Sequence, residues 1–274
     1  MSFDALGTGA LDYLSCRYGT SKLLFRGPRR TLTVPYVAFL GGTETYGKFI
    51  ENPFPSLVEQ HISMTCVNLG CVNAGIDVFS KDMQIAEMTN DAAVTVVQVM
   101  GAHNMSNRFY SVHPRRNDRF LQASSLLQAI YREVDFAEFN FNKHMLGRLL
   151  TLSPDRFQTV VDELREAWVG RMRGMLRGIS GKTVLLWFAD HAPEDDLAPD
   201  DERDPWYVTR AMIEQLGSEV TDVVEVVASD TALALGTEGM VFSQMETPAA
   251  NNLMGPAAHQ EAAEAVAAKL REIM

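Results

Sequence analysis

Five apolar runs of strand length, with helical stretches between most of them, constrain the fold of this chain more than any other feature. Parallel strands need long crossover connections, and helices then bury them on both faces, so each strand becomes a nearly continuous apolar run. The five runs are residues 36–40, 65–69, 94–100, 183–188 and 222–227. The alternation predicts an α/β fold, a three-layer α/β/α sandwich around a parallel five-stranded sheet.

The length of the chain suits one large α/β domain or two small ones, and we expect a single domain over residues 1–274. A hydrophobic content of 46% is enough for a sizeable core. Between the third and fourth runs lies an insert, residues 107–179, in which 119–133 and 154–177 have the spacing of amphipathic helices. We therefore expect a helical insert, which could serve as a lid. The acidic, proline-punctuated stretch 191–204 is predicted to be a solvated loop.

The charge balance and the cysteines limit the class of partner and the compartment. A formal net charge of −11 argues against a general nucleic-acid surface, which needs a basic face. Cys16, Cys66 and Cys71 form neither a metal-type pair nor a disulfide framework, which favours a reducing cytoplasm. No run approaches the roughly 18 apolar residues that span a membrane, and the first residues lack a leader pattern. We expect a cytoplasmic protein with a small-molecule substrate, and a homo-oligomer is compatible with the sequence.

Polar, glycine-containing turns follow the first three apolar runs. Because the carboxyl ends of parallel strands line one crevice, we expect these turns to meet at one active-site rim. Thr43 follows two glycines that let the chain turn sharply, so its hydroxyl is a candidate nucleophile; the alternative is an ordinary strand-to-helix turn. The backbone N–H of Gly70 and the side-chain amide of Asn104 are donors that a developing oxyanion needs. Alternatively, the asparagines at these turns satisfy local backbone groups.

His259 lies in the first turn of the predicted last helix. Ala262, Val266 and Leu270 follow it at helical spacing, which predicts that the imidazole faces the core. The N-terminus of a helix favours neutral imidazole, the form that accepts a proton as a general base. A core histidine bonded to a nearby carbonyl would give the same pattern.

The order of these motifs resembles that of the SGNH (GDSL-type) esterase and acyltransferase superfamily. That superfamily has G-D-S after strand one, a glycine after strand two, G-x-N-D after strand three and D-x-x-H near the C-terminus. The resemblance implies a flavodoxin-like sandwich, with Thr43 as nucleophile, Gly70 and Asn104 in the oxyanion hole, and His259 as general base. The matching segments here are Gly41-Gly42-Thr43, Asn68-Leu69-Gly70, Gly101-Ala102-His103-Asn104 and Pro256-Ala257-Ala258-His259.

The chain departs from this pattern at several positions. Thr43 stands in place of the serine, and Pro256 in place of the aspartate that orients the histidine. An orienting carboxylate would then come from elsewhere, for example from Asp190 or Glu246. The chain as a whole also resembles a domain family of marine alphaproteobacteria to which no chemistry is attached.

Basic residues near the third turn suggest an anionic substrate. Arg115, Arg116 and Arg119 follow that turn, and planar guanidinium groups bind phosphate, sulfate or carboxylate in a bidentate manner. Together with His103 they are the predicted substrate-binding residues; the alternative is that the arginines pair with acidic neighbours. No pair of histidines has the spacing of a zinc site, so we predict no metal and no cofactor.

These patterns lead to one principal interpretation and two alternatives. The principal one is an SGNH-like ester hydrolase or acyl-group transferase that acts on a small anionic substrate. The first alternative is a catalytically silent binding protein that keeps the SGNH fold. The second is a transferase of an activated anionic group, sulfate or phosphate, in which His103 acts with the arginines.

Overall fold

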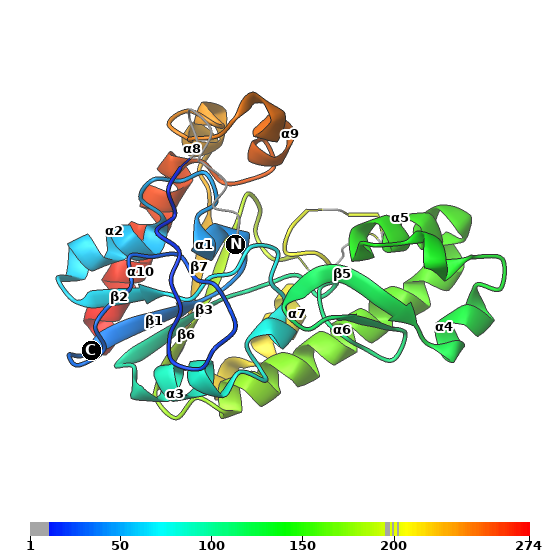
Figure 1. The fold of residues 1–274 in the computed structure, drawn as a ribbon, viewed down its shortest axis with the longest axis horizontal. Helices are drawn as coiled ribbons and strands as arrows, with labels where there is room; N and C mark the ends of the chain where they lie inside the picture. The colour runs from blue at the N-terminus through cyan, green and yellow to red at the C-terminus, as the bar shows by residue number, and fades with distance from the viewer. Residues whose placement is uncertain (1–10, 195–197, 199, 202) are drawn as a thin grey trace.

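The computed structural model describes residues 11–194, 198, 200–201 and 203–274. Its centre is a five-stranded, wholly parallel sheet in the order β2-β1-β3-β6-β7 (Figure 1). The strands are β1 (Tyr36–Leu40), β2 (Thr65–Asn68), β3 (Val94–Gln98), β6 (Lys182–Ala189) and β7 (Asp222–Val227). The prediction of an α/β fold with five parallel strands is confirmed, and each strand overlaps one of the five apolar runs.

The position of each strand explains its sequence pattern. In β1 and β3, which lie inside the sheet, all five residues are buried, as expected of strands covered on both faces. The edge strand β7 instead shows Val224 and Val226 buried between exposed neighbours. One face of β7 therefore packs on the core while the other is open.

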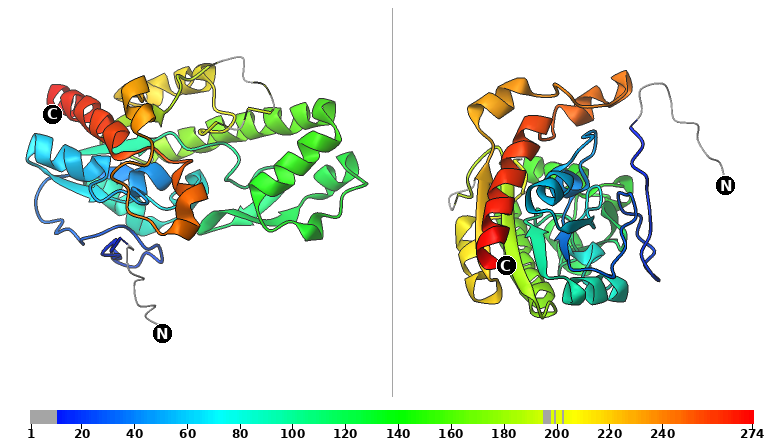
Figure 2. Two further views of the ribbon diagram at one scale, coloured as in Figure 1. Left: turned by 90° about the horizontal axis from the view of Figure 1, so that it is seen from above. Right: turned by 90° about the vertical axis from the view of Figure 1, so that its left-hand side faces the viewer.

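Helices cover both faces of the sheet and complete the three layers (Figures 1 and 2). On one face lie α2 (Phe54–Ile62) and α10 (Pro256–Ile273), whose apolar residues form one cluster with those of the strands. On the other face lie α3 (Met83–Asp91), α6 (Pro154–Arg177) and α7 (Arg210–Glu214). The remaining short elements are α1 (Thr43–Tyr46), η1 (Ile76–Val78), η3 (Gly217–Glu219), α8 (Asp230–Leu235), η4 (Gln244–Glu246) and α9 (Thr247–Ala250).

The insert between β3 and β6 extends beyond the sheet and contains both strands and helices (Figure 1). The predicted helix 154–177 is confirmed at both ends as α6, whose cap is Ser153; its hydroxyl accepts from the Arg156 N–H at 3.4 Å. The other elements of the insert are β4 (Tyr110–His113), β5 (Arg116–Ala123), α4 (Ser125–Ile130), η2 (Phe136–Glu138) and α5 (Asn142–Leu152).

The predicted helix 119–133 is correct only over residues 125–130, and its first five residues are in a strand. These residues belong to β5, which pairs antiparallel with β4 and places Phe120 opposite Val112. A helix begins only at Ser125, where the Ser124 hydroxyl accepts from the Leu127 N–H at 3.3 Å. Pairing with a distant strand has overridden the local helical spacing.

Two further predictions concern loops and membranes. Within the acidic stretch 191–204, residues 195–197, 199 and 202 lie outside the described residues, and the others form neither helix nor strand. Across the described ranges, every helix is too short or too polar to cross a membrane.

Candidate functional site

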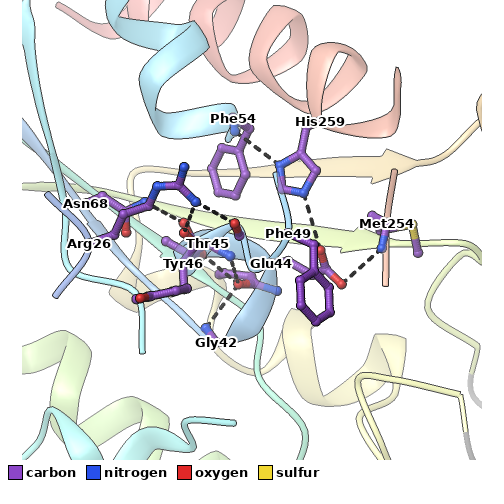
Figure 3. Close-up of polar contacts among 12 residues, drawn as sticks. Arg26, Gly42, Glu44, Thr45, Tyr46, Phe49, Phe54, Asn68, Met254 and His259 are labelled. Carbon is purple, nitrogen blue, oxygen red and sulfur yellow. Dashed lines mark hydrogen bonds and ion pairs between the residues drawn. The ribbon is translucent and has the colours of Figure 1, made fainter. Parts of the chain in front are cut away.

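The turn that carries Thr43 is tied to the end of β3. The Gln98 side-chain oxygen accepts from the Gly42 N–H at 3.1 Å, from the Thr45 N–H at 3.2 Å and from the Thr45 hydroxyl at 2.6 Å (Figure 3). A Cβ added to Gly41 would lie 2.0 Å from the Thr45 hydroxyl oxygen, so only glycine fits there. The sequence Gly41-Gly42-Thr43 therefore builds a turn whose geometry is set by two strands.

The other end of α1 is held by a buried arginine. Arg26 is 7% exposed, and its guanidinium donates to the Tyr46 carbonyl oxygen at 3.3 Å (Figure 3). It also donates to the carbonyl oxygens of Gly47 at 2.5 Å and Glu51 at 2.8 Å. Gly47 ends the helix in the left-handed region, with φ of +70°. A cation near the last carbonyls of a helix compensates their unpaired charge. Arg26 is thus committed to the fold and does not contribute to an anion site.

Thr43 and Asn104 both contact Asn73, a residue that the sequence did not single out. The Asn73 N–H donates to the Thr43 hydroxyl oxygen at 2.9 Å, and that hydroxyl donates to Asn73 Oδ1 at 3.3 Å. The Asn104 amide nitrogen donates to the Asn73 carbonyl oxygen at 3.4 Å. Asn73 has a φ of +55°, which is uncommon for a residue other than glycine and is enriched at functional sites. The predicted convergence of the turns after β1 and β3 is therefore indirect and runs through the turn after β2.

The insert reaches the same place from the other side. Asn73 Nδ2 donates to Asp118 Oδ2 of β5 at 3.4 Å. Asn142, the first residue of α5, donates to Asn104 Oδ1 at 3.1 Å. Thr43, Asn73, Asn104, Asp118 and Asn142 form one hydrogen-bonded group, which we call the asparagine cluster. The signal that could have revealed it is weak, because its members come from five separate segments.

Gly70 lies next to α1, but its N–H has a partner within its own turn. It donates to Asn68 Oδ1 at 2.9 Å, and Asn68 Nδ2 donates in turn to the Thr45 carbonyl at 2.6 Å. A Cβ added to Gly70 would lie 2.3 Å from the Tyr46 nitrogen, so the residue is required for close packing. Its oxyanion role stays a prediction, and that role would need Asn68 to release the N–H.

His259 is fully buried, as its helical position predicted, and both of its ring nitrogens face polar groups (Figure 3). Nδ1 accepts from the Phe54 N–H at 3.1 Å, which puts the proton of a neutral imidazole on Nε2. Nε2 lies 3.4 Å from Glu44 Oε2, without the geometry of a hydrogen bond. Glu44 also accepts from the Met254 N–H at 3.2 Å. Within the described residues, Thr43 and His259 share no hydrogen bond, and the general-base role of His259 stays a prediction.

The two carboxylates that the sequence offered for orienting His259 have other partners. Asp190 accepts from His191 Nδ1 at 2.6 Å, which lowers the pKa of the aspartate below its usual range. Glu246 accepts from the Ser243 hydroxyl at 2.8 Å, and this bond lowers the pKa of the glutamate in the same way. The carboxylate beside His259 is instead Glu44, the residue after Thr43.

His103 is buried, whereas Arg115 and Arg116 of the predicted arginine group are exposed. His103 is 3% exposed and packs on the Trp206 ring, with centroids 4.9 Å apart. Burial lowers the pKa of His103 to about 4, so the ring is neutral at physiological pH. Arg115 and Arg116 are exposed at the tip of the β4–β5 hairpin.

Arg119 has a contact with an aromatic ring, whereas Arg115 and Arg116 are exposed to solvent. The Arg119 guanidinium lies over the Phe141 ring at 4.3 Å, an arrangement typical of a cation–π contact. Among the residues that the structure describes, Arg115, Arg116 and Arg119 form no ion pair. The same part of the chain contains no group of three or more His, Cys, Asp or Glu side chains that could hold a metal ion.

Comparison with known proteins identifies the family. A family model described as "Domain of unknown function (DUF6473)" matches residues 1–274, and the chain belongs to that family. A search of curated proteins found no match.

Solved structures show only a distant likeness. A gut microbial diltiazem-metabolizing enzyme matches with a TM-score of 0.45 and 11% identity over 85% of this chain, which spans 46% of that protein. A lipase from a goat rumen metagenome matches with a TM-score of 0.43 and 10% identity, over 86% of this chain and 97% of the lipase. A possible lipase from Chitinophaga pinensis gives a TM-score of 0.42 and 11% identity, over 87% and 98% of the two chains. Likeness at this level carries no argument about activity, so function has to be argued from the site.

Proposed function

We propose that this protein is an ester hydrolase or acyl-group transferase that acts on a small anionic substrate through the Thr43 hydroxyl. The observation that carries the proposal is the convergence of Thr43 and the Asn104 amide on Asn73 at the carboxyl edge of the sheet. A hydroxyl and an amide donor held around one residue are the parts that attack on an acyl carbon requires. The distant structural matches do not enter this argument.

The proposed reaction uses the asparagine cluster in two roles. The Thr43 oxygen attacks the acyl carbon, and the carbonyl oxygen takes up negative charge. The Asn104 amide, whose present bond to the Asn73 carbonyl is long at 3.4 Å, turns to that oxyanion because a charged acceptor binds it more strongly. The Thr43 proton passes to solvent water during the attack; when the carbonyl re-forms, the ester C–O bond breaks and the alcohol leaves with a proton from solvent. Water or an acceptor alcohol then attacks the acyl group on Thr43, which leaves as the free acid or as a new ester, and Thr43 regains its hydroxyl proton. The Asn73 N–H stays on the threonine oxygen and favours its anionic form.

The β4–β5 hairpin supports an anionic substrate. Arg116 lies two residues before Asp118 in β5, at a place where the pairing with β4 is irregular. Asp118 reaches Asn73, which brings the Arg116 side of the hairpin toward the Thr43 turn. Arg115 and Arg116 are exposed, so their charge is available to a carboxylate or phosphate on the substrate.

A specific observation favours a second candidate, a silent binding protein on the same fold. His259 can accept a proton from Thr43 only with a free lone pair, yet Nδ1 is occupied by the Phe54 N–H and neutral Nε2 carries the proton. The Gly70 N–H is likewise engaged by Asn68. A chain that kept the fold and lost the reaction would have these features. The third candidate, a transferase that uses His103 with the arginines, has no comparable support because His103 is buried under Trp206.

Turnover of short p-nitrophenyl esters tests the proposal. Acetate and succinate monoesters give a neutral and an anionic acyl group, and the rate without protein is subtracted for each, because the succinate carboxylate cleaves its own ester. We expect Thr43→Ala to abolish turnover and Asn104→Ala to lower kcat about 100-fold, the usual cost of an oxyanion donor. Arg115→Ala and Arg116→Ala should raise KM for the succinate ester alone. Thr231→Ala, an exposed threonine of α8, is the matched control and should leave the rates unchanged.

Two outcomes would decide between the candidates. Wild-type rates in both Thr43→Ala and Asn104→Ala would remove the proposed mechanism. No turnover by wild type, together with saturable binding of succinate monoesters that Thr43→Ala weakens, would establish the silent binding protein.

A further inference from the structure

We propose that Asn142, the first residue of α5, is a positioning residue that fixes which end of the Asn104 amide faces the substrate. The catalytic meaning of this inference rests on the proposed function, whereas the orientation itself does not. Asn142 is fully buried and belongs to the insert, and Asn104 belongs to the turn after β3. A link between them makes the insert part of the site.

The surroundings of Asn142 leave its amide only one orientation. The two hydrogens of its NH₂ group are shared among three acceptors, the main-chain carbonyls of Asn117 at 2.5 Å and His103 at 3.3 Å and the Asn104 Oδ1 atom at 3.1 Å. Main-chain carbonyls accept and never donate, so the oxygen of Asn142 cannot take this place. The orientation of Asn142 therefore follows from the backbone around it.

This orientation determines that of Asn104. Because Asn142 presents hydrogens, the atom of Asn104 that faces it has to be the acceptor, Oδ1. The Asn104 nitrogen then points the other way, toward Asn73 and the Thr43 turn. A flipped Asn104 would set two NH₂ groups against each other and would offer an oxygen to the oxyanion. Asn142 thus ensures that the crevice receives a donor.

Packing alone does not account for Asn142. Its side-chain oxygen is buried and has no hydrogen-bond partner among the described residues. A buried polar atom left unpaired costs stability, so such a residue calls for a role other than filling space. Orienting the Asn104 amide requires the side-chain nitrogen of Asn142, and the unpaired side-chain oxygen of Asn142 comes with it.

Asn142 contacts Asn104 because the insert packs against the turns at the edge of the sheet. Asn117 Oδ1 accepts from the Gly75 N–H at 3.1 Å and from the Val78 N–H at 3.0 Å, which fastens β5 to the turn after β2. Arg171 of α6 pairs with the buried Asp77 in the same region. The Asn104 amide is therefore oriented by Asn142 only while the insert is packed against the sheet.

A double-mutant cycle on ester turnover tests the link. Asn142→Asp replaces the donor with acceptors, so Asn104 should flip and kcat should fall about 100-fold, as in Asn104→Ala, while KM stays near that of wild type. Asn142→Ala removes the donor without inverting it, and we expect a loss of about 10-fold. In the Asn104→Ala background neither change should lower kcat further. Losses that multiply in the double variants would overturn the proposal. Asn140→Ala, at an exposed neighbouring asparagine, is the control.

An NMR measurement tests the orientation without any activity. The side-chain NH₂ signals of Asn104 are assigned by their absence in Asn104→Asp. We expect the Asn104 signals to shift in Asn142→Ala and to keep their positions in Asn140→Ala. Asn142→Ala is used here so that the test does not depend on Asn142→Asp being folded. Unchanged Asn104 signals in folded Asn142→Ala would overturn the proposal. Shifted signals in a protein that turns over no ester would leave the positioning role intact and refute the proposed function.

Discussion

His259 holds the start of α2 from the first turn of α10. Its Nδ1 accepts from the Phe54 N–H, and its ring packs against those of Phe54 and Phe188, with centroids 5.9 and 5.4 Å away. A buried N–H that loses its acceptor costs about 1–3 kcal/mol, and truncation of the ring adds a cavity. This residue is therefore important for the fold whatever its part in a reaction.

Two near-isosteric changes separate the functions of the two ring nitrogens. Asparagine places an oxygen near the Nδ1 position, whereas glutamine places its amide near Nε2. We expect His259→Asn to lower the free energy of unfolding by about 1–2 kcal/mol, and His259→Gln and His259→Ala by about 3 kcal/mol or more, because only asparagine keeps an acceptor for Phe54. Urea unfolding at pH 7 measures this. Equal losses in the asparagine and glutamine variants would show that the Phe54 bond contributes little.

His103 should make the protein sensitive to acid. Its pKa is lowered from 6.5 to about 4, chiefly by burial, with Lys143 acting in the same direction and Asp204 against it. Between these values the unfolded chain binds a proton that the native state excludes, so stability is complete above pH 6.5 and falls toward pH 4.

Replacing His103 by phenylalanine removes this titration and keeps a ring against Trp206. We expect the stability of His103→Phe relative to wild type to rise by about 3 kcal/mol between pH 7 and pH 4. Urea midpoints of both proteins across this range provide the comparison. A constant difference between the two curves would mean that the native imidazole titrates normally.

Sequence reasoning reached some of these residues and not others, for a physical reason. The burial of His259 follows from its spacing to Ala262 and Val266, which is a local pattern. Asn73 and Asn142 have no such pattern, because their roles depend on contacts between segments 31 and 38 positions from their partners. The partner of His259 was missed for the same reason.

At the scale of single elements, α6 joins the insert to the sheet. Arg171 of this helix pairs with Asp77, whose side chain is 4% exposed, and also donates to the Ser106 carbonyl at 3.1 Å. Nearer the end of the helix, the Arg177 side chain is 65% exposed and pairs with Glu219 at 2.7 Å. These two ion pairs on one helix differ mainly in burial.

We expect that difference to decide their contributions to stability. Arg171→Ala leaves a buried carboxylate without its cation and should lower the free energy of unfolding by about 3 kcal/mol. Arg177→Ala removes a pair whose arginine is exposed to solvent and should cost far less. Chemical denaturation of both variants gives the two values. A loss in Arg177→Ala as large as that in Arg171→Ala would contradict the argument from burial.

The elements of the insert show where local pattern is sufficient and where it fails. Ser153-Pro154 and the periodicity behind them define α6 at both ends, because capping and amphipathicity are local. In residues 119–133 the apolar side chains fit a helix, yet Leu121 and Leu126 are 55% and 50% exposed. The strand β5 forms because it pairs with β4, and the local sequence pattern of residues 119–133 does not reveal that pairing.

At the scale of the whole molecule, one apolar cluster joins the insert to a face of the sheet. Leu149 of α5 and Phe157 of α6 belong to the same buried cluster as Leu185 of β6. The five apolar runs predicted the sheet, but not its order β2-β1-β3-β6-β7, which depends on how the crossovers pack. The shared core predicts that the described parts of the chain unfold as one unit.

Two spectroscopic probes test this. Trp168 in α6, Trp187 in β6 and Trp206 are all buried in the shared core, so tryptophan fluorescence reports on its packing, while circular dichroism reports on all helices. We expect the urea transitions seen by the two probes to coincide in wild type and in Leu146→Ala, a truncation in α5. A separate early transition in Leu146→Ala would identify the insert as an independent domain.

The turn that carries Thr43 is fastened by Gln98 at its beginning and by Arg26 at its end. Because the turn is anchored in this way, the Thr43 hydroxyl cannot move toward a ligand, and the turn loses little conformational entropy when a ligand binds. Selectivity between ligands must then come from the segments around the Thr43 turn, above all from the β4–β5 hairpin that carries Arg115 and Arg116. Related chains with another hairpin would be expected to choose other ligands while keeping the same turn.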